Sequence, residues 1–356
     1  MSSETTVLLH IGTPKTGTTS LQKFLMDNAR ALQKRGVDYP TDERIFWHWA
    51  HHPLGAVLSK PYARWVDASY NRPPQEAFAP LREHIEKTRA HTVLLSSEQF
   101  FLAKNLKQLP SLLPGVRIRV LCYFRWQVEF LRSWFRQAIV AGGNFWQLDE
   151  SNFERFIKRW TESLDHYETA SELARIFGKE NLALRIFERD CLRDGDIVSD
   201  VLEALDLPAD LAQRGRDSRA IEVNTAVSGD LLELKAHSLT KRWWKGDLKR
   251  MRRFSRALEH DLQRLSTGST HSAALEASFG RELRDRVRAR YEDSNRRFLA
   301  EFAPPRASLP REEGAAAAPR PTEIDLERMA ELLVVSWQAQ DQRIQELEAQ
   351  LGTGGS

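Results

Sequence analysis

Short apolar runs alternate with amphipathic segments along the N-terminal half of the chain. The runs with the length and composition of buried strands are residues 7–9, 92–96, 117–124 and 182–187. Between them, apolar side chains recur at helical spacing in segments that include Leu21, Phe78, Val128 and a stretch from about Phe153 to Ile176. This alternation predicts an α/β fold, in which a mostly parallel sheet is covered by helices on both faces and ligands bind at the carboxyl ends of the strands.

The pattern changes after residue 303. Residues 304–322 are rich in Pro, Ala, Arg and Glu and predict a linker, and residues 352–356 have the composition of a tail. Between them, residues 323–351 predict a C-terminal helix that either forms a short coiled coil in a homo-oligomer or packs back on the domain. Its near-heptad apolar positions are Leu333, Trp337, Ile344, Leu347 and Leu351. We therefore expect one domain over residues 1–303, followed by a C-terminal helical extension. Within the domain, residues 37–75 lack clear periodicity and form an insert that is a candidate lid over the acceptor.

Composition narrows the class of protein. A chain of 356 residues with 41% hydrophobic and 28% charged residues can bury a large core, and its net charge of +3 is too small to indicate nucleic acid. No apolar run is long enough for a transmembrane segment, and the first strand begins without a signal-like leader, so we expect a cytoplasmic protein. Two cysteines, Cys122 and Cys191, are too few for a disulfide framework and lack zinc-site spacing.

A glycine-rich loop follows the first apolar run and precedes the first predicted helix. Gly12 and Gly17 allow tight turns and close approach of an anion, and the N–H groups at the helix start have no partner within the helix. In a Walker A loop the lysine follows the second glycine directly. Here Thr18 stands at that position, while Lys15 lies two residues before Gly17. The loop therefore predicts a phosphate or sulfate site that differs from the usual nucleoside triphosphate loop.

Residues 14–19 resemble the 5′-phosphosulfate loop of the PAPS-dependent sulfotransferases, whose pattern is P-K-[ST]-G-T-T. The resemblance implies a three-layer P-loop-type fold, PAPS as the donor substrate, adenosine 3′,5′-bisphosphate as the product, and no requirement for a metal. The donor-binding residues that it implies are Pro14, Lys15, Thr16, Gly17, Thr18, Thr19 and Ser20. Ser20 is a departure, because many cytosolic members of the family have a tryptophan there that stacks on adenine.

A second candidate site follows the strand at residues 117–124. Arg125 comes directly after this strand, and Ser133 lies eight residues later along the following predicted helix, so both can converge on one anion. The spacing resembles the 3′-phosphate clamp of sulfotransferases. The alternative is that Arg125 and Ser133 are solvated helix residues.

Glu98 is the candidate base, because it lies just after the strand at residues 92–96. Some carbohydrate-modifying sulfotransferases have a glutamate at this place, and a partly buried carboxylate can accept a proton. Ser96 and Ser97 are further candidates for nucleotide contacts. Alternatively, Glu98 caps a helix or pairs with an arginine, and one of three histidines of the insert acts as base: His48, His51 or His52. A metal site at His48 and His52 is a weaker alternative, because no third ligand is evident.

The acceptor is suggested by the aromatic insert. Residues 46–52 contain Phe46, Trp47 and Trp49 among the three histidines, and aromatic faces can bind sugar rings or aryl groups. Together with a glutamate base, this favours a carbohydrate or glycolipid hydroxyl as acceptor. Phenols, peptidyl tyrosine and other hydroxyl metabolites remain open.

The sequence therefore predicts a sulfotransferase that acts by in-line displacement, with Glu98 as base and Lys15 stabilising the leaving phosphate. The alternatives are a P-loop nucleotide kinase or NTPase, and a non-catalytic P-loop assembly protein that acts through its C-terminal helix. Residues 241–256 are strongly basic, which is typical of a solvated helix face. The alternatives are a groove for an acidic polymer and, through Lys245 and Gly246, a loop over the 3′-phosphate. Phe187 is either a core residue or the aromatic group near adenine.

Overall fold

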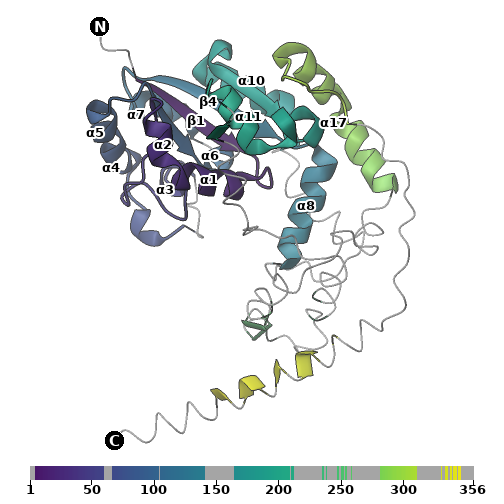
Figure 1. The fold of residues 1–356 in the computed structure, drawn as a ribbon. Helices are drawn as coiled ribbons and strands as arrows, with labels where there is room; N and C mark the ends of the chain where they lie inside the picture. Colours follow the sequence, from purple (N-terminus) through teal and green to yellow (C-terminus); the bar gives the residue numbers. More distant parts are fainter. Residues whose placement is uncertain are drawn as a thin grey trace, which may run out of the picture. The chain divides into compact units, whose positions relative to one another are not determined.

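The structure is a computed structural model, and it describes residues 5–59, 66–103, 105–140, 164–208, 210–211 and 281–310, with single positions in 235–258 and 330–345. The chain divides into two compact units (Figure 1). The first comprises residues 1–130, 162–223 and 289–310, and the second comprises residues 131–161, 224–288 and 311–356. The domain expected over residues 1–303 and the linker after it stay predictions.

A five-stranded parallel sheet forms the centre of the first unit. Its strands are β1 (Thr6–Gly12), β2 (Val37–Asp38), β3 (Thr92–Ser96), β4 (Arg117–Phe124) and β5 (Leu182–Ile186). They lie in the order β2-β3-β1-β4-β5, and every pairing is parallel. The predicted α/β fold and its four strands are confirmed. Only β2 was not predicted, because a two-residue edge strand leaves no periodic signal.

Helices cover both faces of this sheet (Figure 1). Alternate residues of β1 point to opposite faces. Val7 and Leu9 enter one apolar cluster with α5 (Ala79–Lys87) and α10 (His166–Phe177), whereas Leu8 enters the other with α1 (Thr18–Asp27) and α11 (Ile197–Ala204). The helices of this unit are α1 (Thr18–Asp27), α2 (Ala29–Gln33), α3 (His52–Ala56), α4 (Pro74–Ala77), α5 (Ala79–Lys87), α6 (Gln99–Leu102), α7 (Leu109–Leu112), α10 (His166–Phe177) and α11 (Ile197–Ala204). Two longer helices, α8 (Gln127–Val140) and α17 (Arg281–Phe302), and five short 3₁₀ turns complete the described elements: η1 (Ala68–Tyr70), η2 (Leu106–Gln108), η4 (Lys179–Asn181), η5 (Arg189–Cys191) and η6 (Arg193–Gly195). Both described faces are therefore layered as an α/β/α fold requires.

The insert at residues 37–75 is largely packed against the core. Ile45, Leu54 and Leu58 are completely buried in the cluster that also contains Val93 and Leu95 of β3. Phe46, Trp47 and Trp49 are half-buried, and His48 is exposed. The segment lacks periodicity because its contacts come from turns and the single-turn helix α3 rather than from a long helix or strand.

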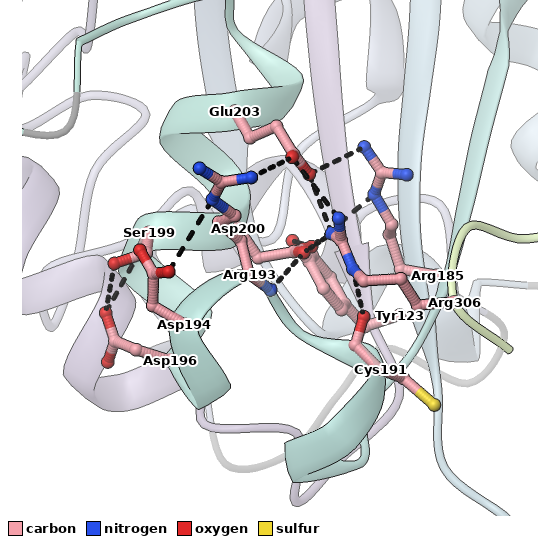
Figure 2. Close-up of polar contacts among 10 residues, drawn as sticks. All are labelled: Tyr123, Arg185, Cys191, Arg193, Asp194, Asp196, Ser199, Asp200, Glu203 and Arg306. Atoms are coloured by element: carbon pink, nitrogen blue, oxygen red, sulfur yellow. Dashed lines mark hydrogen bonds and ion pairs between the residues drawn. The ribbon is translucent and has the colours of Figure 1, made fainter.

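A buried carboxylate joins four parts of the first unit (Figure 2). Asp200 of α11 is 0% exposed and accepts hydrogen bonds from Tyr123 Oη of β4 at 2.7 Å and from Arg306 Nη2 at 2.8 Å. Arg185 of β5 lies 3.4 Å from the same carboxylate, and the main-chain N–H of Arg193 donates to it at 2.9 Å. Arg306 belongs to the predicted linker, so the first residues after α17 are held against the sheet.

In the second unit, the C-terminal segment packs on a segment near residue 250. Met251 and Phe254 form a small apolar cluster with Val334 and Trp337. The buried Asp341 carboxylate forms ion pairs of 3.1 Å with Arg250 and 2.8 Å with Arg253. The described residues of the C-terminal helix therefore pack on their own chain, and its coiled coil in a homo-oligomer stays a prediction.

Several sequence predictions lie outside the described residues. These are residues 153–163 of the helix predicted to run to Ile176, Lys245 and Gly246 in the basic stretch, residues 311–322 of the linker, Leu347, Leu351 and residues 352–356. One continuous helix over residues 153–176 is wrong, because Asp165 is extended and caps α10, which begins at His166. Among the helices that are described, none combines the length and apolar character needed to cross a bilayer.

Candidate functional site

The carboxyl ends of β1, β3 and β4 meet at one edge of the sheet. The loop after β1 is tied to β4 by a hydrogen bond of 3.1 Å from Thr13 N to Tyr123 O. The segment after β3 is tied to β1 by a bond of 3.2 Å from Ser97 N to His10 O. In an open parallel sheet, this edge next to a change in strand order is where ligands bind.

The loop after β1 has a backbone shape suited to an anion. Lys15 and Gly17 both adopt left-handed angles, with φ of 71° and 69°. Gly17 precedes the first turn of α1 and has no side chain to cap it, so the helix N-terminus is left for a ligand. Thr16 Oγ1 donates to Thr13 O at 2.7 Å and closes the loop. The Thr13 hydroxyl is buried and makes no hydrogen bond among the described residues, so a bound anion could accept from it.

Gly12 is required by close approach rather than by its backbone angles. A Cβ atom there would lie 2.5 Å from Thr18 Cγ2 and 2.9 Å from Thr16 Oγ1. Among the other predicted donor residues, Pro14 is buried, Thr19 is half-buried and Ser20 is exposed. The predicted donor residues therefore form one continuous loop from β1 into α1.

Arg125 contacts this loop directly. Its Nη1 donates a hydrogen bond of 2.7 Å to the main-chain oxygen of Lys15. Its guanidinium carbon lies 5.8 Å from the centroid of the Phe187 ring, and the same ring would be 3.2 Å from a Cβ atom on Gly17. The structure thus brings Arg125 and Phe187 to the loop after β1. Ser133 lies on α8 within the second unit, and its part in a clamp with Arg125 stays a prediction.

Lys15 and Glu98 lie within electrostatic reach of each other. Burial lowers the pKa of Lys15, the Glu98 carboxylate opposes that shift, and the Arg125 guanidinium adds to it. Glu98 is half-buried, and its Oε2 accepts a hydrogen bond of 3.3 Å from Gln22 Nε2. A cation on the loop and a carboxylate after β3 are therefore brought to the same edge.

Gln22 and His10 belong to this site and were not singled out by the sequence. Gln22 is buried on α1 and also donates to Ser96 Oγ at 3.3 Å. His10 Nδ1 lies 2.8 Å from the same Ser96 hydroxyl. Burial lowers the pKa of His10 to about 3, so its ring is neutral at physiological pH. The spacing of Gln22 along a helix was the available signal, since a polar residue on the apolar face of α1 needs a buried partner.

The three histidines of the insert differ in their surroundings. His51 Nε2 donates to Pro40 O at 2.9 Å, and its Nδ1 accepts from Ser96 N at 3.1 Å, so both ring nitrogens are engaged by the main chain. Burial lowers the pKa of His51 to about 3. This arrangement gives His51 a structural role and leaves it no lone pair for a substrate.

His52 lies nearer to the candidate base. Its Nδ1 is 2.8 Å from Ser97 Oγ, which also accepts from Gln99 N at 3.0 Å. Burial lowers the pKa of His52, the Glu98 carboxylate opposes this shift, and His48 adds to it. His52 is therefore the buried histidine that responds to Glu98. No group of three or more His, Cys, Asp or Glu side chains that could hold a metal ion occurs in the described part of the chain.

Comparisons with known proteins give weak similarities and no family. No protein family matches the chain, and no solved structure matches it. The thymidine kinase of Mannheimia succiniciproducens is 25% identical over 180 residues, which are 50% of this chain and 78% of that protein. The thymidine kinase of Haemophilus influenzae is 25% identical over 130 residues, 36% of this chain and 57% of that protein. An uncharacterised protein of Archaeoglobus fulgidus is 25% identical over 138 residues, and this match spans only 35% of its length. At 25% identity, these matches do not assign the chain to a family.

Proposed function

We propose that the chain is a PAPS-dependent sulfotransferase that moves a sulfuryl group to an acceptor hydroxyl and releases adenosine 3′,5′-bisphosphate. The observation that carries the proposal is the position of Lys15. It lies on the loop itself, at a left-handed backbone angle, with Arg125 bonded to its carbonyl and Glu98 within electrostatic reach. A lysine at this place can contact the oxygen that bridges phosphorus and sulfur.

In the proposed reaction, the acceptor oxygen attacks the sulfur in line with the bridging oxygen. The new oxygen–sulfur bond forms as the bond from sulfur to the 5′-phosphate oxygen breaks, and Glu98 takes the hydroxyl proton. Lys15 and the N–H groups of the loop stabilise the negative charge that develops on the leaving phosphate, and such preorganised donors contribute most in a dry site. Gln22 orients the Glu98 carboxylate through its 3.3 Å hydrogen bond.

The donor would be held at both ends. The loop at residues 14–20 binds the 5′-phosphosulfate, and Arg125 binds the 3′-phosphate. Phe187 lies beside Arg125 and Gly17, where its half-exposed ring is available to a nucleotide. A carbohydrate or glycolipid hydroxyl is the favoured acceptor.

The second candidate is a P-loop nucleotide kinase, and the named thymidine kinases favour it. A kinase must stabilise the β- and γ-phosphates of a nucleoside triphosphate, for which a Walker A loop uses a lysine directly after its second glycine. In this chain Thr18 stands there. We therefore rank sulfuryl transfer first.

Calorimetric titration separates the two functions. Adenosine 3′,5′-bisphosphate should bind at least about tenfold more tightly than adenosine 5′-monophosphate, because the 3′-phosphate adds charge-assisted hydrogen bonds. ATP with Mg²⁺ that binds as tightly as the bisphosphate, with no gain from the 3′-phosphate, would reject the sulfotransferase in favour of the kinase.

Turnover gives a second test of the same proposal. Lys15→Ala should lower transfer of label from PAPS by about 10²-fold or more, a typical loss for one stabilising donor. The matched control is Lys23→Ala, because Lys23 is partly exposed on α1 and, among the described residues, forms an ion pair only with Asp27 at 3.4 Å. Equal turnover in the two variants would show that Lys15 does not take part in sulfuryl transfer.

A further inference from the structure

Four residues of the insert form a tight turn with an unusual backbone. Trp47 N donates to Ala50 O at 2.8 Å, and Ala50 N donates to Trp47 O at 3.2 Å. The two central residues, His48 and Trp49, both have positive φ, at 47° and 68°. Two reciprocal bonds around two left-handed residues are the pattern of a type I′ turn.

Such turns normally contain Asn-Gly or Gly-Gly, because glycine adopts positive φ without strain. Histidine tolerates the left-handed region moderately, but a bulky tryptophan there is an outlier. The surrounding structure fixes the turn: Tyr39 Oη donates to Trp49 O at 2.8 Å, and Ala50 is completely buried. Strained backbone that persists in this way is concentrated at functional sites.

The turn lies beside the candidate base. The Trp47 ring packs edge-on against His48, with centroids 4.1 Å apart, and lies 6.3 Å from the ring of His52. His52 contacts Ser97, the neighbour of Glu98. His48 is exposed and Trp47 and Trp49 are half-exposed, so aromatic surface is open to solvent next to the segment that follows β3.

We propose that the turn Trp47-His48-Trp49 is a binding subsite for a pyranose ring, on which the acceptor hydroxyl is presented to Glu98. The apolar C–H face of the sugar packs on the indole of Trp47, and His48 hydrogen-bonds a ring hydroxyl. This inference rests on the proposed function and specifies its acceptor class.

The polar groups around the turn favour a sugar over a phenol. His48 is exposed and Glu98 is half-buried, so a ligand with several hydroxyls can hydrogen-bond both of them. The buried Gln22 and His52 support this side by bonding Glu98 and Ser97. A phenol has one hydroxyl, which can bond Glu98 but leaves nothing in the ligand for His48 to bond. The strain has a simple explanation in this setting, because glycine at positions 48 and 49 would form the same turn without any ring to contact the sugar.

The test compares two replacements of His48. His48→Gly removes the ring and relieves the positive φ, so the melting temperature should rise, whereas His48→Ala removes the ring and keeps the strain. If His48 binds the sugar, both variants raise the KM for the acceptor by about tenfold, the effect of one lost hydrogen bond. Trp47→Ala should raise that KM at least as much, with Trp47→Phe intermediate.

The acceptor probes are methyl β-D-glucopyranoside, methyl β-D-galactopyranoside and N-acetylglucosamine, each assayed with labelled PAPS beside 4-nitrophenol and thymidine. Labelling of a pyranoside that depends on Trp47 and His48 supports the subsite. Labelling only of 4-nitrophenol or thymidine, labelling of no pyranoside, or an unchanged KM in both His48 variants overturns it. Calorimetric binding of adenosine 3′,5′-bisphosphate is measured on every variant. Retained binding with no sugar labelling rejects the subsite alone, whereas absent binding in the wild type rejects the sulfotransferase itself.

Discussion

Arg125 Nη1 donates a hydrogen bond of 2.7 Å to the main-chain oxygen of Lys15, across 110 residues of sequence. The bond fixes the loop from the neighbouring strand at the residue whose φ is 71°. Arg125 therefore has a structural task in the loop in addition to the contact with phosphate that we propose for it. Any variant of Arg125 must be interpreted with both tasks in mind.

Arg125→Ala should weaken binding of adenosine 3′,5′-bisphosphate by about 10²-fold, because it removes a charged hydrogen-bond donor and loosens the loop. Arg125→Lys keeps the charge, but a lysine lacks the planar fork that can bond Lys15 and a phosphate together, so it should restore only part of the affinity. Isothermal titration with adenosine 5′-monophosphate separates the two tasks. If the loss is equal for both ligands, Arg125 acts only on the loop and does not bind the 3′-phosphate.

Gly12→Ala tests the close packing beneath the loop. Its Cβ atom would lie 2.5 Å from Thr18 Cγ2, a distance that side chains do not adopt, so the loop must shift. We expect a loss of about 1–3 kcal/mol in the free energy of unfolding and a loss of bisphosphate binding. The double variant Gly12→Ala/Thr18→Ser removes the Cγ2 atom. It should recover part of the free energy of unfolding and part of the bisphosphate binding. No recovery would place the clash at Thr16 Oγ1 instead.

The sequence was sufficient for the elements that have a local signal. The strands at residues 92–96 and 117–124 were predicted with the bounds that the structure has. Arg125 meets the loop because the carboxyl ends of adjacent parallel strands lie at one edge, so the strand assignment already implied this convergence.

The remaining features depend on contacts between residues far apart in sequence. Asp200 and Arg306 are 106 residues apart, and neither lies in a motif that indicates a partner. Gln22 looked like an ordinary helix residue until β3 placed Ser96 and Glu98 beside it. The positive φ values of His48 and Trp49 had no signal at all, because their residue types favour other turns.

Buried histidines should make stability fall in mild acid. Burial lowers the pKa of His10 and of His51 to about 3 and that of His166 to about 4, from an ordinary value of 6.5. Between these values the unfolded chain binds more protons than the folded chain, so stability is complete above about pH 6.5 and is lost as the pH falls below it. At pH 5, each histidine should lower the free energy of unfolding by about 2 kcal/mol relative to its value above pH 6.5.

Urea unfolding between pH 5 and 8 measures this effect. His10→Asn should reduce the slope of the unfolding free energy against pH by up to about 1.4 kcal/mol per pH unit below pH 6, because one titrating group is removed. Above pH 7, the slope should match that of the wild type, since His10 is then deprotonated in both states. A variant with the wild-type slope below pH 6 would show that His10 does not titrate on unfolding.

Asp200 should be a main determinant of stability in the first unit (Figure 2). Its carboxylate is fully buried and receives hydrogen bonds from Tyr123 and Arg306, with Arg185 3.4 Å away. Removing one partner of a buried ion pair leaves the other charge uncompensated. Asp200→Ala should therefore lower the free energy of unfolding by about 3–5 kcal/mol. Tyr123→Phe should cost about 1–2 kcal/mol, the cost of a lost buried hydrogen bond.

Arg306→Ala provides the matched comparison for Asp200. After this substitution, Arg185, Tyr123 and the Arg193 N–H still hold the Asp200 carboxylate. Because the Arg306 side chain is also 34% exposed, the loss in the free energy of unfolding should be only about 1 kcal/mol.

Because Arg306 also pairs with Glu203 at 2.7 Å, the cycle with Asp200→Asn must include Glu203→Gln. Urea unfolding of the single and double variants gives the coupling energy between Arg306 and each carboxylate. Strict additivity of Arg306→Ala and Asp200→Asn would mean that the segment after α17 is held by Glu203 and by the Cys191 carbonyl, which accepts from Arg306 Nε at 3.0 Å, rather than by Asp200.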